Sequence, residues 1–406
     1  MNTINIISKN ICTGCSACIT MCPTKCITMK LDKEQFLYPQ IDLNKCIKCG
    51  KCLKHCPIDN LLDLNKNITY YVATAKDTVQ VQKSSSGGAF YIAAKYVIEK
   101  LNGYVCGAVL DENLKLNHKI INRVEDIVKM QGSKYIQSEM GDCLKKIIKL
   151  LRNGEYVLFS GTPCQVAGLK KITSEEERKK LFTLDLICHG VPSAYAFSDS
   201  MKKMYGLGEY KDFSFRQHSK FLLTSYSYSF YKNNKNKKKN LELQKNEKVT
   251  RIFSFEDPFY QSFLVGNNYR ESCYNCKYAT SNRCGDITIG DCASSNMYRK
   301  LLGRSLSSVI INTEQGNILW EKIKEEFDYE LADYGEEVKL NKQLHQPVGR
   351  PSKRNEFYID LKNMKSDEFK KKYCPKRGVK EKIKHFLLWH IPVATRIKLK
   401  ILLRRI

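Results

Sequence analysis

From residue 70 onward, short apolar runs alternate with stretches whose apolar residues recur every three or four positions. The apolar runs predict buried strands at residues 70–73, 104–110, 156–159 and 181–187. Between them, the periodic stretches predict helices that begin after Gly88 and Pro163, and a further helix at residues 144–151. This alternation favours an α/β domain built on a largely parallel sheet, in which ligands gather at the carboxyl ends of the strands.

Other segments do not follow this α/β pattern. Residues 27–30 and 36–41 predict two short strands near the N-terminus. Residues 213–216 and 222–231 predict antiparallel strands, residues 255–264 a helix and residues 308–312 another strand. The Lys/Asn-rich run at residues 232–248 is typical of a solvated hairpin tip or a disordered loop.

Eight of the 18 cysteines fall into two copies of one pattern. The spacing C-x2-C-x2-C-x3-C-P occurs at residues 12–23 and again at 46–57, and it is typical of bacterial ferredoxins with two 4Fe-4S clusters. The first three cysteines of each run bind one cluster and the fourth binds the other. The predicted ligand sets are Cys12, Cys15, Cys18 and Cys56 for the first cluster, and Cys46, Cys49, Cys52 and Cys22 for the second. A zinc ribbon would use two C-x2-C pairs instead, and Cys26, outside the pattern, is expected to be a small buried side chain.

The expected fold class is therefore a multidomain α+β and α/β protein. Residues 1–65 form a small ferredoxin-like domain, residues 70–350 an α/β domain with a mixed sheet (about 70–150 and 151–350 as its two parts), and residues 351–406 a basic helical tail. Pro392 divides the end of this tail, residues 379–406. That segment predicts either a helix packed on the body or an interfacial helix on an anionic membrane.

Composition narrows the functional classes. With 406 residues, 42% of them hydrophobic, the chain can form a sizeable core. Its formal charge of +26 favours acidic partners, but no nucleic-acid-binding motif occurs, so no nucleic-acid partner is expected. The N-terminus lacks the apolar stretch of a secretory signal, and no apolar run reaches the roughly 18 residues of a membrane span. We therefore expect a cytoplasmic protein, with peripheral contact at the inner face of the membrane as the alternative.

Beyond the cysteine repeat, six motifs in order resemble the coenzyme F420 hydrogenase/dehydrogenase beta-subunit family. They are Ser84-Ser-Ser-Gly-Gly88, Gly132-Ser-Lys-Tyr-Ile-Gln-Ser138, Gly161-Thr-Pro-Cys-Gln165, Asp185-Leu-Ile-Cys-His-Gly-Val-Pro-Ser193, Ser272-Cys-Tyr-Asn-Cys276 and Asp286-Ile-Thr-Ile-Gly-Asp291. The resemblance covers about residues 70–350. It implies an iron–sulfur flavoprotein in which FAD handles hydride and a third 4Fe-4S cluster lies in the same domain.

The FAD site is expected at the first three of these motifs. Glycines there allow close approach of the backbone, and N–H groups at the helix starts after Gly88 and Pro163 can bind a pyrophosphate. Lys134 can neutralise a phosphate or stabilise a reduced, anionic flavin. The expected contacts are Ser85, Ser86, Gly87, Gly88, Gly132, Ser133, Lys134, Tyr135, Gly161, Thr162, Pro163 and Gln165.

The resemblance also implies four cysteine ligands for the third cluster, namely Cys164, Cys188, Cys273 and Cys276. Three alternatives stay open. In the first, the C-x2-C pair binds zinc together with Cys284 and Cys292. In the second, Cys284 or Cys292 replaces Cys164 or Cys188 as a ligand of the third cluster. In the third, Cys164 is a reactive thiol at a helix N-terminus. The family usually has an aromatic residue where this chain has Cys292, so Cys292 has no assigned role.

The predicted function is that of an oxidoreductase that moves electrons between FAD and 4Fe-4S clusters, with coenzyme F420 or another organic substrate on the hydride side. The alternatives are a ferredoxin-dependent reductase linked to polysaccharide or other organic substrate metabolism, and a flavin-less electron-wiring subunit. No catalytic side chain is assigned. The expected partners are a small-molecule hydride donor or acceptor and a redox protein, either ferredoxin or another electron-transfer subunit. Four lysines along the second cysteine run suit an acidic redox partner, with a solvated face as the alternative: Lys45, Lys48, Lys51 and Lys54.

Overall fold

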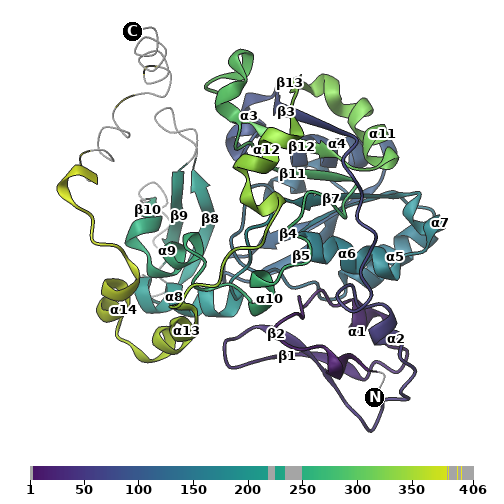
Figure 1. Ribbon diagram of the computed structural model, residues 1–406, viewed down its shortest axis with the longest axis horizontal. Coiled ribbons are helices and arrows are strands. Elements are labelled where there is room, and N and C mark those ends of the chain that lie inside the picture. Colours follow the sequence, from purple (N-terminus) through teal and green to yellow (C-terminus); the bar gives the residue numbers. More distant parts are fainter. Residues whose placement is uncertain are drawn as a thin grey trace, which may run out of the picture.

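The computed structural model describes residues 3–217, 225–233 and 249–381, together with residues 383, 391 and 395. Figure 1 shows a small N-terminal unit, a large sheet flanked by helices, and a smaller sheet beside them. Residues 218–224 and 234–248, and most of residues 382–406, lie outside the described residues. The predictions made there, for part of a strand, for most of the Lys/Asn-rich run and for the end of the tail, stay predictions.

The N-terminal unit is built around a strand pair and two short helices. Its elements are η1 (Ile4–Ile6), α1 (Ala17–Met21), β1 (Ile27–Leu31), β2 (Leu37–Ile41) and α2 (Lys51–Lys54). β1 and β2 pair antiparallel, with Ile27 opposite Ile41, so both predicted strands are present. Four of the six buried residues in the apolar cluster of this unit are cysteines, which makes its core dependent on what the thiols bind.

The main sheet has eight described strands in the order β13-β3-β12-β11-β7-β6-β4-β5. Their bounds are β3 (Thr69–Ala75), β4 (Tyr104–Leu110), β5 (Leu116–Ile121), β6 (Val157–Gly161), β7 (Leu181–Leu186), β11 (Ile287–Asp291), β12 (Ser307–Ile311) and β13 (Phe327–Leu331). Among these strands β4, β6, β7 and β11 pair parallel, and the other neighbours pair antiparallel. The prediction of a largely parallel sheet is therefore wrong, whereas the mixed sheet is found. β4 and β5, for example, are joined by residues 111–115 alone, which are too few for a parallel crossover.

Helices cover both faces of the main sheet (Figure 1). On one face, α4 (Ala89–Leu101), η2 (Val124–Lys129) and α11 (Glu314–Ile323) share an apolar core with the strands. On the other face lie α5 (Cys143–Arg152) and α6 (Pro163–Ile172), and their core also includes Cys15 and Ala17 of the N-terminal unit. The N-terminal unit is thus packed against the α5–α6 face.

The second sheet carries an aromatic core. β8 (Glu209–Gln217), β9 (Ser225–Asn233) and β10 (Thr250–Phe253) form an antiparallel sheet in the order β10-β9-β8. Packed on it are α8 (Ala194–Tyr205), η4 (Ser254–Glu256), α9 (Pro258–Leu264), α13 (Arg354–Asn363) and α14 (Ser366–Tyr373). The first helices of the expected tail, α13 and α14, bury Phe357 and Phe369 completely in this core.

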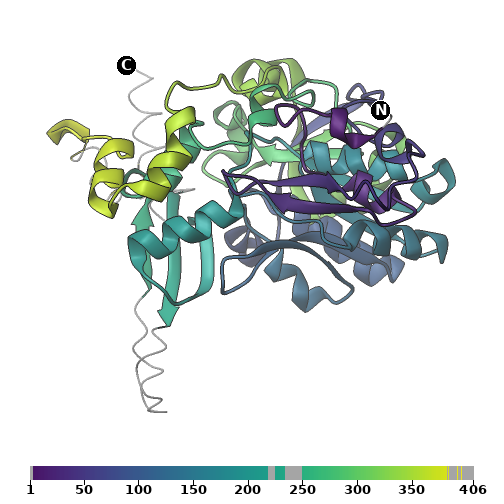
Figure 2. The ribbon, with the colours of Figure 1, turned by 90° about the horizontal axis from the view of Figure 1, so that it is seen from below.

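Shorter elements complete the described fold. They are α3 (Thr78–Lys83), α7 (Glu175–Arg178), α10 (Glu271–Tyr274), α12 (Tyr334–Leu340), η5 (Ser295–Met297), η6 (Arg299–Leu301), η7 (Lys324–Glu326) and η8 (Lys342–Leu344). In Figure 2 the β1–β2 pair extends from the N-terminal unit toward α13, where Glu34 meets Arg354. Within the described ranges, no helix combines the length and the apolar character needed to cross a membrane.

Candidate functional site

Two small cavities in the N-terminal unit are lined by the predicted ligand cysteines. The wall of the first cavity includes Cys12, Cys15, Cys18 and Cys56. The wall of the second includes Cys22, Cys46, Cys49 and Cys52. The fourth cysteine of each run therefore faces the cavity of the other run, which is the crossed grouping that the spacing predicts.

The backbone of the two cysteine runs repeats an uncommon conformation. The residues on either side of the second cysteine have positive φ angles, 69° at Gly14 and 65° at Ser16, and 52° at Lys48 and 72° at Gly50. Turns of this kind direct successive backbone N–H groups toward the inside of a loop, where they can donate to a negatively charged group. The sequence repeat is therefore a structural repeat as well.

Cys26 brings a fifth thiol to the second cavity. It is buried, as expected, but it also lies on the cavity wall with the four predicted ligands. Its Sγ lies 3.4 Å from Sγ of Cys22. Cys26 lies outside the repeated cysteine pattern in the sequence, but in the folded protein it lies beside the predicted ligands.

A larger cavity, of about 440 Å³, lies at the carboxyl ends of β6 and β7. This edge is where ligands bind in sheets with parallel strands. Eleven of the twelve predicted FAD contacts lie on its wall: Ser85, Ser86, Gly88, Gly132, Ser133, Lys134, Tyr135, Gly161, Thr162, Pro163 and Gln165. Residues from three separate stretches of the sequence, near 85, 133 and 162, thus converge on one space.

Gly87 is the exception, because it does not lie on the cavity wall but packs against the sheet behind it. A side-chain carbon at Gly87 would lie 2.2 Å from the backbone oxygen of Ala73 and 2.8 Å from the backbone nitrogen of Ser307. The Gly87 N–H donates to Ser307 Oγ at 2.8 Å. Glycine is needed here so that the start of α4 can pack closely on β3 and β12.

The four cysteines predicted for the third cluster lie on the wall of the same cavity: Cys164, Cys188, Cys273 and Cys276. They come from the start of α6, the end of β7, and α10 with the turn that follows it. Burial raises the pKa of the Cys164 thiol to about 11 and that of Cys188 to about 12. Iron binds the thiolate form, so a cluster at this site would require release of the thiol protons.

Cys284 and Cys292 are directed elsewhere. Cys284 Sγ donates to the backbone oxygen of Pro163 at 3.1 Å, behind the cavity wall. Cys292 contacts Ser294 Oγ at 3.4 Å and Tyr70 Oη at 3.7 Å, in a separate core. This placement disfavours the zinc alternative, which needed both thiols beside the C-x2-C pair.

The first ferredoxin cavity adjoins the large cavity. A side-chain carbon at Gly168 of α6 would lie 3.0 Å from Sγ of Cys15. Gln137, on the wall of the large cavity, donates to the backbone oxygen of Thr13 at 2.9 Å, and Thr13 lies on that wall too. The loop that carries Cys12 and Cys15 is therefore packed directly against the Cys164 region.

Lys134 is the one charged side chain among the predicted FAD contacts on the cavity wall. Its Nζ donates to the backbone oxygens of Met130 and Gln131 at 2.7 and 2.8 Å. Burial lowers the pKa of Lys134 to about 7. A lysine in this state can supply either a positive charge or a neutral amine close to neutral pH.

His118, from β5, also lies on this wall and was not found from the sequence. Burial lowers its pKa to about 4, so the ring is neutral. Its Nε2 lies 3.1 Å from the backbone oxygen of Ser160, which can only accept, and Nδ1 therefore accepts from Ser138 Oγ at 2.9 Å. His118 orients the chain around Ser160 and Gly161.

The wall has features that fit a flavin nucleotide. Two buried oxygens on it, Thr13 Oγ1 and Gln131 Oε1, have no hydrogen-bond partner among the described residues. Gly88 and Gly132 adopt positive φ angles of 85° and 79°, a conformation that turns the backbone there without a side chain in the way. Opposite them, Arg216 and Tyr226 reach the cavity from the second sheet, with Arg216 paired to Asp291 at 2.7 Å. Glycines, hydroxyl groups, amides and one lysine form a suitable donor set for a pyrophosphate and a polar ring.

The fold and these thiol sets define an iron–sulfur electron-transfer protein. Comparison of the sequence with known families finds two matches. Residues 154–337 match the family described as the C terminus of the coenzyme F420 hydrogenase/dehydrogenase beta subunit, and residues 11–60 match the 4Fe-4S dicluster domain. The predicted resemblance is confirmed: a match to the 4Fe-4S dicluster domain is followed along the chain by a match to the C terminus of the F420 hydrogenase/dehydrogenase beta subunit.

Individual relatives are similar to parts of the chain. One subunit of the F(420)H(2) dehydrogenase from Methanosarcina mazei is 23% identical over 197 residues, which are 45% of this chain and 54% of that protein. NADH-quinone oxidoreductase subunit I 2 from Geobacter metallireducens is 44% identical over 59 residues, 13% of this chain and 45% of that protein. The chain thus spans about half the length of the curated relatives it matches. A solved chain of the F420-reducing [NiFe] hydrogenase complex from Methanosarcina barkeri has a TM-score of 0.46 at 16% identity, covering 69% of this chain and 91% of that one.

Proposed function

We propose that this protein is an iron–sulfur flavoprotein oxidoreductase that moves electrons between FAD and three 4Fe-4S clusters. The observation that carries the proposal is the convergence of eleven predicted FAD contacts and four cysteines on one cavity. That cavity adjoins the first of the two ferredoxin cavities through α6 and Cys15. The proposed electron path runs between the large cavity, the first ferredoxin cavity and the second, in either direction.

The residues around the large cavity have separate tasks in this proposal. FAD bound there would exchange electron pairs with an organic substrate and single electrons with iron–sulfur clusters. The Ser85–Gly88 and Gly161–Gln165 segments offer hydroxyl and backbone N–H groups for the pyrophosphate. Lys134 supplies the positive charge, or the proton, that a reduced ring requires. Cys164, Cys188, Cys273 and Cys276 hold the third cluster beside it.

Iron and flavin analysis of anaerobically purified protein tests this function. Three clusters correspond to about twelve irons per chain, together with bound FAD. Cys273→Ser should lower the iron content to about eight. Cys284→Ser is the matched control, because Cys284 is a buried thiol in the same region that does not line the cavity, and it should retain all the iron. About eight irons in the unmodified protein, unchanged by Cys273→Ser, would exclude the third cluster.

The identity of the electron donor separates the candidate reactions. If reduced coenzyme F420 bleaches the flavin absorbance rapidly, the hydride side uses a deazaflavin, as the names of the relatives suggest. Bleaching by reduced ferredoxin alone supports a ferredoxin-dependent reductase of another organic substrate. A protein with all its iron but no flavin would instead be an electron-wiring subunit.

A further inference from the structure

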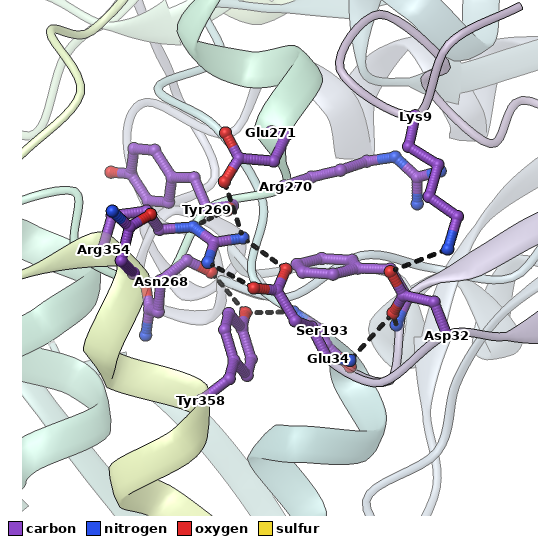
Figure 3. A network of polar contacts seen from close by, with 12 residues as sticks. Lys9, Asp32, Glu34, Ser193, Asn268, Tyr269, Arg270, Glu271, Arg354 and Tyr358 are labelled. Atoms are coloured by element: carbon purple, nitrogen blue, oxygen red, sulfur yellow. Dashed lines mark hydrogen bonds and ion pairs between the residues drawn. The ribbon is translucent and has the colours of Figure 1, made fainter.

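Arg270 is a buried cation that reaches from the main body into the N-terminal unit. Only 1% of its surface is exposed, and it immediately precedes α10. Its Nε donates to the backbone oxygen of Cys12 at 2.7 Å, and Nη2 donates to the backbone oxygen of Leu37 at 3.0 Å. Nη2 also lies 3.9 Å from Sγ of Cys12 itself (Figure 3 shows Arg270 beside the N-terminal unit).

The guanidinium group is fixed in this position from several sides. Tyr38 lies under it, with the ring centroid 4.0 Å from Cζ. The absence of a side chain at Gly14 leaves space for the guanidinium group, because a side-chain carbon at Gly14 would lie 3.2 Å from Cζ of Arg270. Nη1 donates to Gln137 Oε1 at 3.1 Å. The position of the charge is therefore set by packing as well as by hydrogen bonds.

No carboxylate pairs with Arg270 anywhere in the described part of the chain, and its hydrogen-bond acceptors are neutral oxygens. The neighbouring Arg354, equally buried, is paired with the carboxylates of Glu34 and Glu271. A buried charge is costly unless an opposite charge compensates it. A cluster bound by Cys12 would place a negatively charged thiolate–iron centre beside the guanidinium group, because Nη2 lies 3.9 Å from Sγ of Cys12.

Arg270 also lies on the wall of the large cavity, together with the thiols assigned to the third cluster. It is three residues from Cys273 in sequence and touches Cys12 in space. Its charge is thus located where the two thiol sets adjoin, and none of the motifs described above includes it.

We propose that Arg270 is the counter-charge of the cluster bound by Cys12, Cys15, Cys18 and Cys56, and that it raises the reduction potential of this cluster. Reduction adds one electron and hence one negative charge, so a fixed cation favours the reduced state. The inference rests on cluster binding by residues 11–60 and does not require FAD. In this role Arg270 acts through its charge and favours electron entry into the cluster that Cys12 helps to bind.

The test is a redox titration of the complete, iron-loaded protein with dithionite, followed by electron paramagnetic resonance. Arg270→Gln removes the charge and should lower the reduced-to-oxidised ratio of one cluster about tenfold at a fixed potential, equivalent to about 59 mV for a one-electron couple. Arg270→Lys should restore most of this ratio. The affected signal should be the one that Cys12→Ser perturbs, and the signal perturbed by Cys49→Ser should not shift.

Two further variants keep the test decisive. Gln137→Glu places a carboxylate next to Nη1 without removing Arg270, and it should lower the same ratio even if Arg270→Gln does not fold. Arg350→Gln removes a partly exposed cation near the same interface, whose hydrogen bonds go to Glu271 and Asn355, and it should leave every ratio unchanged. Unchanged ratios in iron-loaded Arg270→Gln or Gln137→Glu would overturn the proposal. An equal shift in Arg350→Gln would do the same, because it would show that removing a cation without contact to Cys12 has the same effect.

Discussion

Removal of Arg354 should release the N-terminal unit from the body of the protein. Arg354 belongs to α13, and its side chain is completely buried. Its two terminal nitrogens donate to both carboxylate oxygens of Glu34 at 3.0 and 2.8 Å, and Nε donates to the backbone oxygen of Tyr269 at 2.7 Å (Figure 3). Glu34 lies between β1 and β2, so this pair joins the two parts of the chain.

The expected loss of docking free energy depends on how well the remaining carboxylate, that of Glu34, can be hydrated. Breaking a buried ion pair by removing one partner costs about 3–5 kcal/mol, mostly because the other charge is left uncompensated. Arg354→Met leaves Glu34, whose side chain is 20% exposed and can be partly hydrated. We therefore expect the lower end, about 3 kcal/mol, or roughly a 150-fold change in the equilibrium between docked and undocked states.

Amide hydrogen exchange measured by mass spectrometry can follow this equilibrium, because exchange at a buried interface reports local opening. Peptides covering residues 30–40 and 265–275 should exchange faster in Arg354→Met, at unchanged iron content. Arg350→Met is the matched control. Arg350 pairs with Glu271 at 2.8 Å, but its side chain is 37% exposed. The side chains that accept its hydrogen bonds, Glu271 and Asn355, lie outside the N-terminal unit. Its effect should stay below about 1 kcal/mol. If Arg354→Met and Arg350→Met exchange alike, the pair with Glu34 does not hold the interface.

Three further outcomes follow from the cavity and the N-terminal unit. The pKa of Lys134 is lowered to about 7 in the folded protein, so between pH 7 and about 10.5 the unfolded chain binds more protons than the folded one. The free energy of unfolding of flavin-free protein should therefore rise with pH through this window, relative to that of Lys134→Met. Parallel melting-temperature profiles of the two proteins would contradict this. Cys22→Ser should keep the second cluster because Cys26 can replace the ligand, whereas Cys22→Ser with Cys26→Ser should lose about four irons; equal iron loss in both would refute replacement. Charge reversal along the second cysteine run should slow reduction by ferredoxin about tenfold at low salt and have little effect at high salt, and an indifferent rate at low salt would exclude docking there. The residues to reverse are Lys45, Lys48, Lys51 and Lys54.

The sequence was most informative where neighbouring residues act together. Each cysteine run folds locally, so its spacing predicted the crossed thiol sets, and the apolar run at residues 104–110 coincides with β4. Pairing direction was less accessible, because β12 and β13 reach β3 from more than 200 residues away. Contacts across the interface left almost no local signal. Arg270 lies 258 residues from Cys12, and Arg354 lies 320 residues from Glu34. Proximity of Arg270 to the C-x2-C pair was its one sequence clue.

The two ferredoxin thiol sets differ in how the rest of the protein covers them. Cys12, Cys15, Cys18 and Cys56 are all buried, and Arg270 and α6 cover the loop around Cys12 and Cys15. In the second set, Cys49 is exposed, and it is surrounded by exposed lysines and by Ile47, which is 64% exposed. Single-electron exchange with another protein needs close approach of a cluster to the surface. A redox partner that approaches this side of the molecule would therefore meet the second cluster first, and an acidic protein surface would suit both the lysines and the apolar contact.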